Sequence, residues 1–255
     1  MSYNYPALDY DDYQNAYVVA ANAADHVSQL VSAYDVKPPE SLRVYDYLTY
    51  EADYNKVGFN YYPFKGKLAK IMGGSLMVGD ARDDKLPFAE VGINAGTYQG
   101  RQNHTALHEV MHYHVDVPNG YAGESFPSLF EHGNYTPEEQ FRELTADFGA
   151  AMMHIPTPAM LTCIQQCRDL YQGFSQQFAS SYGGNFTRVR DYLAIELGYN
   201  WGYACNVVTE YQRNPTSESL LYNIVYQVTG GHDVKGVTLD GDHSAQWDFR
   251  DSPFD

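Results

Sequence analysis

The sequence predicts an α+β fold, in which a small antiparallel sheet packs on a helical core and a helical C-terminal region follows. Three observations support this class. Apolar residues recur at helical spacing over residues 9–34, short β-branched and aromatic segments fill residues 42–100, and helical spacing resumes after Gln102 and continues to about residue 229. A chain of 255 residues, 44% of them hydrophobic and 19% charged, can bury a core of this kind.

The first predicted element is a helix over residues 9–34, which Lys37-Pro38-Pro39 ends. Four short strands joined by hairpins should follow, because Gly, Pro and Asp clusters separate them. The helix is indicated by Val18, Val19, Ala23, Val27, Leu30 and Val31, and the strands by LRVYDYLTY, KVGFNYYPF, KIMGGSLMVG and FAEVGIN.

Helices should make up most of the remaining chain. Breaks are expected at residues 117–135, Thr157-Pro158, Gly183-Gly184 and Asn214-Pro215, and an extended tail after that. Half of the 24 tyrosines precede residue 63, in a segment rich in Asp. Since tyrosine buries its ring and keeps its hydroxyl wet, this segment is interpreted as a packing and partner-facing layer.

Charge and cysteine content narrow the functional classes. The formal net charge of −16 argues against nonspecific binding to nucleic acid or to an anionic membrane. The three cysteines Cys163, Cys167 and Cys205 are too few for a disulfide framework and fit a reducing compartment. Without a signal-peptide pattern or an apolar run of about 18 residues, we expect a cytoplasmic soluble protein.

The most informative motif is His108-Glu109-Val110-Met111-His112, an H-E-x-x-H pattern inside a predicted helix. Residues four apart share one helix face, so both imidazoles can reach one metal ion. Glu109 is offset from that pair and can lean toward a water at the metal as a general base.

A third ligand is predicted on a second helix, 31 residues beyond His112. Glu143 would complete the set of three protein ligands that a catalytic Zn²⁺ requires, and Asp147 lies four residues later on the same face. Asp147 would accept the outer N–H of a ligand histidine and fix its orientation. With two neutral imidazoles and one carboxylate the site keeps a net charge near +1, which suits metal-assisted hydrolysis of a peptide bond.

The remaining polar side chains near the motif have open roles. His104 and His114 are interpreted as structural or surface residues, because neither fits the geometry around Glu109. A transition-state stabiliser is still needed, and the sequence does not choose one. The candidates are His114, His154, Tyr113 and Tyr121.

These motifs resemble the ImmA/IrrE family of zinc metallopeptidases. VGINAGTYQGRQNHTALHEVMH is similar to the family's Ile-Asn strand and zinc-binding helix, and ELTADFGAAMMHIP (143–156) is similar to its E-x-x-A-N-x-F-A-x-x-L-L-M-P stretch. Residues 189–198 resemble the helix-turn-helix-like tail that often follows the peptidase core. The resemblance covers roughly residues 45–212 and is most specific over 91–156.

The resemblance implies a gluzincin-like organisation with a zincin-type helical core. The expected parts are an N-terminal helical Tyr-rich segment (1–40), a zinc metallopeptidase core (41–160), a helical, helix-turn-helix-like region (161–230) and an extended tail (231–255). Some positions depart from the family pattern without removing a ligand: Met111 replaces a glycine, Gly149 a phenylalanine, His154 a leucine and Ile155 a methionine. The changes at 149 and 154 should alter the pocket wall.

The resemblance further implies a Zn²⁺-dependent endopeptidase that cleaves a helix-turn-helix repressor and so derepresses genes of a mobile element, a prophage or a stress response. A basic DNA-binding partner fits the acidic charge. The strand with Ile93 and Asn94, if it is an edge strand, could align an extended substrate by strand addition.

Two other classes stay open. One is a non-hydrolytic binder, an antirepressor or toxin–antitoxin-type component that sequesters a repressor or toxin. The other is a hydrolase for a small amide. Direct nucleic-acid binding is not expected, because the second helix of the helix-turn-helix-like segment, from Tyr199 to Asn206, has no Lys or Arg. Cys163 and Cys167 lack a second ligand pair and are expected to be buried small hydrophobes.

Overall fold

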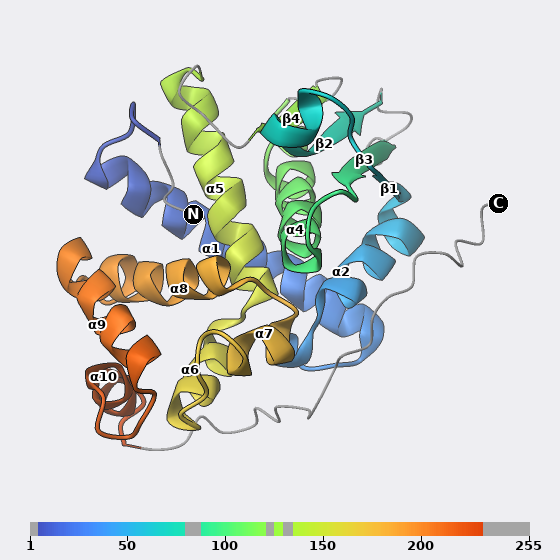
Figure 1. Cartoon of the computed structure of the whole chain (residues 1–255). Helices are drawn as coiled ribbons and strands as arrows, with labels where there is room; N and C mark the ends of the chain where they lie inside the picture. Colours follow the sequence, from blue (N-terminus) through green and yellow to red (C-terminus); the bar gives the residue numbers. More distant parts are fainter. Residues whose placement is uncertain (1–4, 80–87, 121–124, 130–134, 232–255) are drawn as a thin grey trace.

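The structure is a computed structural model that describes residues 5–79, 88–120, 125–129 and 135–231 (Figure 1). It begins with α1 (Tyr10–Asp35), which confirms the predicted first helix. Asp9 and Asp12 form a capping box at its start, and Val36 adopts a left-handed conformation that ends it. The short turn η1 (Pro39–Ser41) follows at the predicted proline break.

Four strands form one sheet in the order β1-β3-β2-β4. They are β1 (Val57–Tyr62), β2 (Met72–Val78), β3 (Ala89–Asn94) and β4 (Ser125–Leu129). The α+β class is confirmed, but the sheet is mixed rather than wholly antiparallel, because β1 pairs with β3 in parallel. The chain from 63 to 71, with α3 (Leu68–Ile71), replaces the expected hairpin, so β3 takes the place beside β1.

Two local predictions were wrong, the strand at LRVYDYLTY and the break at Gly183-Gly184. LRVYDYLTY forms α2 (Val44–Tyr50) and leads into the π-helical turn η2 (Glu51–Asn55), because Tyr47 and Tyr50, three residues apart, both pack into the helical core. The break predicted at 117–135 does separate two helices, and it contains the turn η3 (Val117–Asn119) and strand β4, which was not predicted. Gly183-Gly184 lies inside the first turn of α8 (Tyr182–Asp191), where Ser181 caps the Gly184 amide.

Helix α4 (Gln99–Val115) lies at the centre of the fold, between the sheet and the helix α5 (Pro137–His154). Ala106 and Tyr113 of α4 pack against the sheet, while Leu107 and Met111 pack on the side of α5 and α1. A capping box between Thr136 and Glu139 starts α5. The fold therefore holds two helices rigidly against each other along their length (Figure 1).

Met111 and Gly149, two positions that differ from the ImmA/IrrE pattern, face each other across α4 and α5. A Cβ atom placed on Gly149 would clash with Met111 Cε and lie 2.5 Å from Met111 Sδ. The thioether of Met111 therefore fills the space that a side chain at position 149 would need. A large side chain on α4 thus faces a glycine on α5, and the two residues are matched in volume.

We expect strong coupling between positions 111 and 149 in stability. Gly149→Phe alone should overfill the contact, and Met111→Gly alone should leave a cavity, each lowering the free energy of unfolding by about 2–4 kcal/mol. In the double variant the aromatic ring fills the space left by Met111, so its loss should be smaller than the sum by about 1–3 kcal/mol. Denaturant unfolding of all four proteins measures this, and additive losses would contradict the match in volume.

The helices beyond Ile155 share a separate apolar core. They are α6 (Thr157–Gln165), α7 (Gly173–Phe178), α8, the π-helical turn η4 (Tyr192–Glu196), α9 (Trp201–Arg213) and α10 (Leu220–Val228). α9 contributes Val207, Val208 and Tyr211 to this core, which confirms a packing role for its inner face. Cys163 is buried there as predicted, whereas Cys167 is only partly buried.

In the described part of the chain, no helix is long and apolar enough to cross a membrane. The break predicted at Asn214-Pro215 falls between α9 and α10, as expected, whereas Thr157 and Pro158 begin α6, so that break lies just before them, at residues 155–156. The predicted extended tail lies outside the described residues beyond its first position, Gly231.

Candidate metal centre

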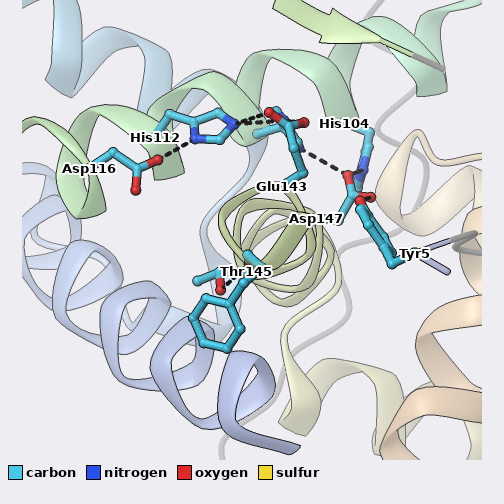
Figure 2. A network of polar contacts seen from close by, with 9 residues as sticks. Tyr5, His104, His112, Asp116, Glu143, Thr145 and Asp147 are labelled. Carbon is cyan, nitrogen blue, oxygen red and sulfur yellow. Dashed lines mark hydrogen bonds and ion pairs between the residues drawn. The ribbon is translucent and has the colours of Figure 1, made fainter. Parts of the chain in front are cut away.

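The three predicted metal ligands meet between α4 and α5. His108 and His112 lie one turn apart on α4, and Glu143 faces them from α5 (Figure 2). All three side chains are buried. The four-residue spacing places both imidazoles on one face of α4, and the packing of α5 brings the carboxylate to that face.

The separations of the ligand atoms suit one tetrahedral ion. His108 Nε2 and His112 Nε2 are 3.0 Å apart. The Glu143 oxygens lie 3.3 Å from His108 Nε2 and 3.4 Å from His112 Nε2. Ligand atoms about 2.0–2.1 Å from one Zn²⁺ at tetrahedral angles lie about 3.3–3.4 Å from each other. The residues present therefore fit a metal ion with three protein ligands.

Two outer carboxylates determine which ring nitrogen carries the proton. Asp147 Oδ1 is 2.9 Å from His108 Nδ1, and Asp116 Oδ2 is 2.5 Å from His112 Nδ1. Because an ionised carboxylate only accepts, each Nδ1 donates, and in the neutral imidazole each Nε2 then carries a lone pair. Two lone pairs and the Glu143 carboxylate then converge on one point, an arrangement that could hold a metal ion.

The buried charges favour a positive charge at the same point. Burial lowers the pKa of His108, but hydrogen bonds to Asp147 and Glu143 outweigh this and raise it well above its usual value. Burial also lowers the pKa of His112, whereas Glu143 and Asp116 raise it, to about 9. Burial raises the pKa of Glu143, and the two histidines bring it down to about 2. Metal binding must therefore displace protons from the imidazoles.

Glu109 lies beside this group without joining it. Its side chain is fully buried, and neither carboxylate oxygen has a hydrogen-bond partner among the described residues. Burial raises the pKa of Glu109 to about 7, against the opposing charges of His108 and His112. Strand β2 comes close because Gly74 has no side chain: a Cβ there would lie 3.3 Å from Glu109 Oε1. A buried carboxylate with unsatisfied oxygens is costly to stability, as expected for a group kept for chemistry.

Asp147 has the predicted outer role, and Asp116 has the same role unpredicted. Asp116 is buried at the end of α4 and holds the Nδ1 of His112. The sequence contained a signal, because Asp116 follows His112 by the same four residues that separate Glu143 from Asp147. Each imidazole ligand thus has its own carboxylate, one from each helix.

We expect Asp116→Asn to weaken metal binding by about 10–100-fold, because the neutral amide no longer orients His112 with a charge. Asp25→Asn, on the exposed face of α1, is a matched control that should bind metal like the unmodified chain. Competition with a chelator of known affinity measures both variants. An unchanged affinity in Asp116→Asn would contradict the assigned role.

His104 lies closer to the centre than the sequence suggested. Its Nε2 is 3.3 Å from Asp147 Oδ1, so His104, His108 and Asp147 form a second candidate metal group. We favour the first group, because the second would require the Nδ1 of His108, which Asp147 already holds as a donor. His104 therefore belongs to the surroundings of Asp147, which is consistent with its interpretation as a structural residue.

Three of the candidate stabilisers are directed elsewhere. His114 Nε2 is 2.7 Å from Glu51 Oε1, because two residues along a helix turn the side chain to the far side of α4. Tyr113 is buried against the sheet. His154 donates to the Phe178 carbonyl over 2.8 Å, and burial lowers its pKa to about 4. The structure does not bring these three to the ligands, and Tyr121 lies outside the described residues.

Tyr135 is a further candidate that the sequence reasoning missed. It is half-buried directly before the capping residue of α5. Burial raises its pKa, and the charges of Glu143, Glu139 and Glu109 raise it further, which places the phenol near the carboxylates of the site. The sequence contained a signal for this candidate, because Tyr135 lies about two helical turns before Glu143, just ahead of the same helix.

The prediction that Ile93 and Asn94 form a substrate-aligning edge strand is wrong. They lie in β3, which is paired on both sides, with β1 and β2. The Asn94 side chain instead accepts from the Phe64 and Gly96 amides and donates to the Met72 carbonyl. A strand with both edges paired has no free backbone groups for a peptide.

In comparisons with known proteins, no family model and no curated protein matched this chain. The assignment of a function therefore depends on the geometry of the site and on the residue patterns described above.

Proposed function

We propose that this protein is a zinc-dependent endopeptidase. The observation that carries the proposal is the convergence of His108 Nε2, His112 Nε2 and the Glu143 carboxylate beside the buried carboxylate of Glu109, which has no hydrogen-bond partner among the described residues. A structural metal site is closed by four ligands and has no use for a buried base. Three protein ligands with an adjacent carboxylate are typical of a hydrolytic site.

Each residue of the site has a separate role in the proposed hydrolysis. A bound Zn²⁺ would polarise the scissile carbonyl and activate a water. Glu109 accepts a proton from the attacking water and passes it to the departing amine. Asp147 and Asp116 keep His108 and His112 oriented as ligands throughout. The Tyr135 hydroxyl is our candidate donor to the carbonyl oxygen as negative charge develops there.

We further propose that the substrate is a helix-turn-helix repressor, in line with the residue patterns shared with the ImmA/IrrE family. An acidic chain would attract a basic DNA-binding protein and would not compete for its DNA. The edge strand β4, which contacts α4, replaces β3 as the element that could pair with an extended substrate segment. Such a substrate would place the reaction in the cytoplasm.

The proposal is tested by incubating the Zn²⁺-loaded chain with helix-turn-helix repressors encoded beside its gene. We expect one specific cut in one of them, mapped by mass spectrometry of the intact fragments. Loss of repressor function without any cut would instead favour the non-hydrolytic binder. Hydrolysis of small amides alone would favour the third class.

A further inference from the structure

We infer that Tyr5 is a positioning residue for the metal centre, so that the N-terminal segment forms part of the centre's surroundings. The inference rests on the proposed metal site. Tyr5 Oη donates to Asp147 Oδ2 over 2.8 Å, and Asp147 Oδ1 accepts from His108 Nδ1 over 2.9 Å (Figure 2). Two hydrogen bonds therefore connect the phenol to a metal ligand.

The Tyr5 ring is firmly held in the fold. The side chain is 2% exposed and packs with Leu144 and Phe148 on α5. The segment is held again two residues later, where the Ala7 amide donates to Gln140 Oε1 over 3.0 Å. Residues 5–7 thus lie along α5, and the position of the hydroxyl is set by packing of the whole segment rather than by a mobile side chain.

Asp147 is a side chain that such a hydroxyl can control. It accepts from Tyr5 through one oxygen and from His108 and His104 through the other. Without the phenol, the carboxylate is free to rotate and to share Oδ1 differently between the two histidines. With it, Oδ1 stays aligned with His108, so the ligand is oriented before the metal arrives and less free energy is lost on binding.

A thermodynamic consequence follows from this connection. If docking of the N-terminal segment strengthens metal binding, metal binding must strengthen docking of the segment by the same factor. The state of the metal centre and the state of residues 5–7 are therefore coupled, although 142 positions separate Tyr5 from Asp147.

The test compares Tyr5→Phe with Tyr17→Phe. Tyr17 belongs to the same buried cluster and donates to a different carboxylate, Glu196, over 2.9 Å. We expect Tyr5→Phe to weaken Zn²⁺ binding by about three- to tenfold, less than the 10–100-fold typical for loss of the direct partner of a ligand. Tyr17→Phe should lose comparable stability and keep the affinity of the unmodified chain. Chelator competition measures affinity, and the Co²⁺ absorption spectrum reports a change in ligand geometry.

Combining Tyr5→Phe with Asp147→Asn tests whether the hydroxyl acts through Asp147. In the Asp147→Asn background, removal of the phenol should change Zn²⁺ affinity by less than about twofold, because the carboxylate it positions is already gone. Additive effects, or an unchanged affinity in Tyr5→Phe alone, would overturn the inference. Failure of the unmodified chain to bind Zn²⁺ would instead contradict the proposed metal site itself.

A second measurement needs no substitution. Hydrogen exchange of the Ala7 amide should slow by the same factor when the unmodified chain is loaded with Zn²⁺. Equal exchange in the metal-free and loaded forms would also overturn the inference.

Discussion

Glu109→Gln should abolish cleavage of the protein substrate while leaving the metal in place. General acid–base catalysis contributes about 10²–10⁴-fold to a rate, so the variant should lose activity in that range. Metal content should stay near that of the unmodified chain, because Glu109 is outside the ligand set. Rates of substrate cleavage and metal analysis of the same samples measure the two effects separately.

The amide is also expected to fold at least as stably as the carboxylate. Both Glu109 oxygens are buried without a partner among the described residues, so replacement with a neutral group removes a desolvation cost. Glu138→Gln, on the exposed first turn of α5, is the control and should cleave normally. If Glu109→Gln inactivates the partner as well as the unmodified chain does, the protein acts by binding and the hydrolytic proposal fails.

His112→Ala should lower bound zinc well below one ion per chain. The substitution removes one of three ligands and leaves Asp116 without its donor, so the affinity should fall by more than about 100-fold. His108→Ala should behave in the same way. His26→Ala, exposed on α1, is the matched control, and metal analysis after gel filtration gives the stoichiometry. Stoichiometric zinc in either ligand variant would show that the ligands are wrongly chosen.

His112→Ala should also show how much of the chain's stability comes from bound metal. A ligand present at about 1,000 times its dissociation constant stabilises the folded state by about 4 kcal/mol, which corresponds to about 8–16 °C in the melting temperature of a chain this long. A chelator should therefore lower the melting temperature of the unmodified chain and leave that of His112→Ala nearly unchanged. Calorimetry measures both, and an equal shift in the two proteins would be inconsistent with metal binding at His112.

The sequence predicted the site residues correctly where they depend on side-chain chemistry and on spacing over one or two turns of a helix. The pair His108 and His112 and the pair Glu143 and Asp147 both follow four-residue spacing, and the structure assigns them the expected positions. Asp116 follows His112 at the same spacing, so its role could also have been predicted. The strand prediction for LRVYDYLTY failed, because the tyrosines that favour a strand locally are spaced to pack on the helical core.

By itself, the sequence determined that two helices carry the ligands and the base, because the 3.6-residue period within each helix decides which of its side chains share a face. Only the tertiary structure decided that β3 is an internal strand and that His104 rather than His114 approaches Asp147. It also decided that Tyr5 donates a hydrogen bond to Asp147. The tertiary structure also explains Met111, whose side chain occupies the space over Gly149. These outcomes depend on the packing of elements distant in the chain, which local spacing does not encode.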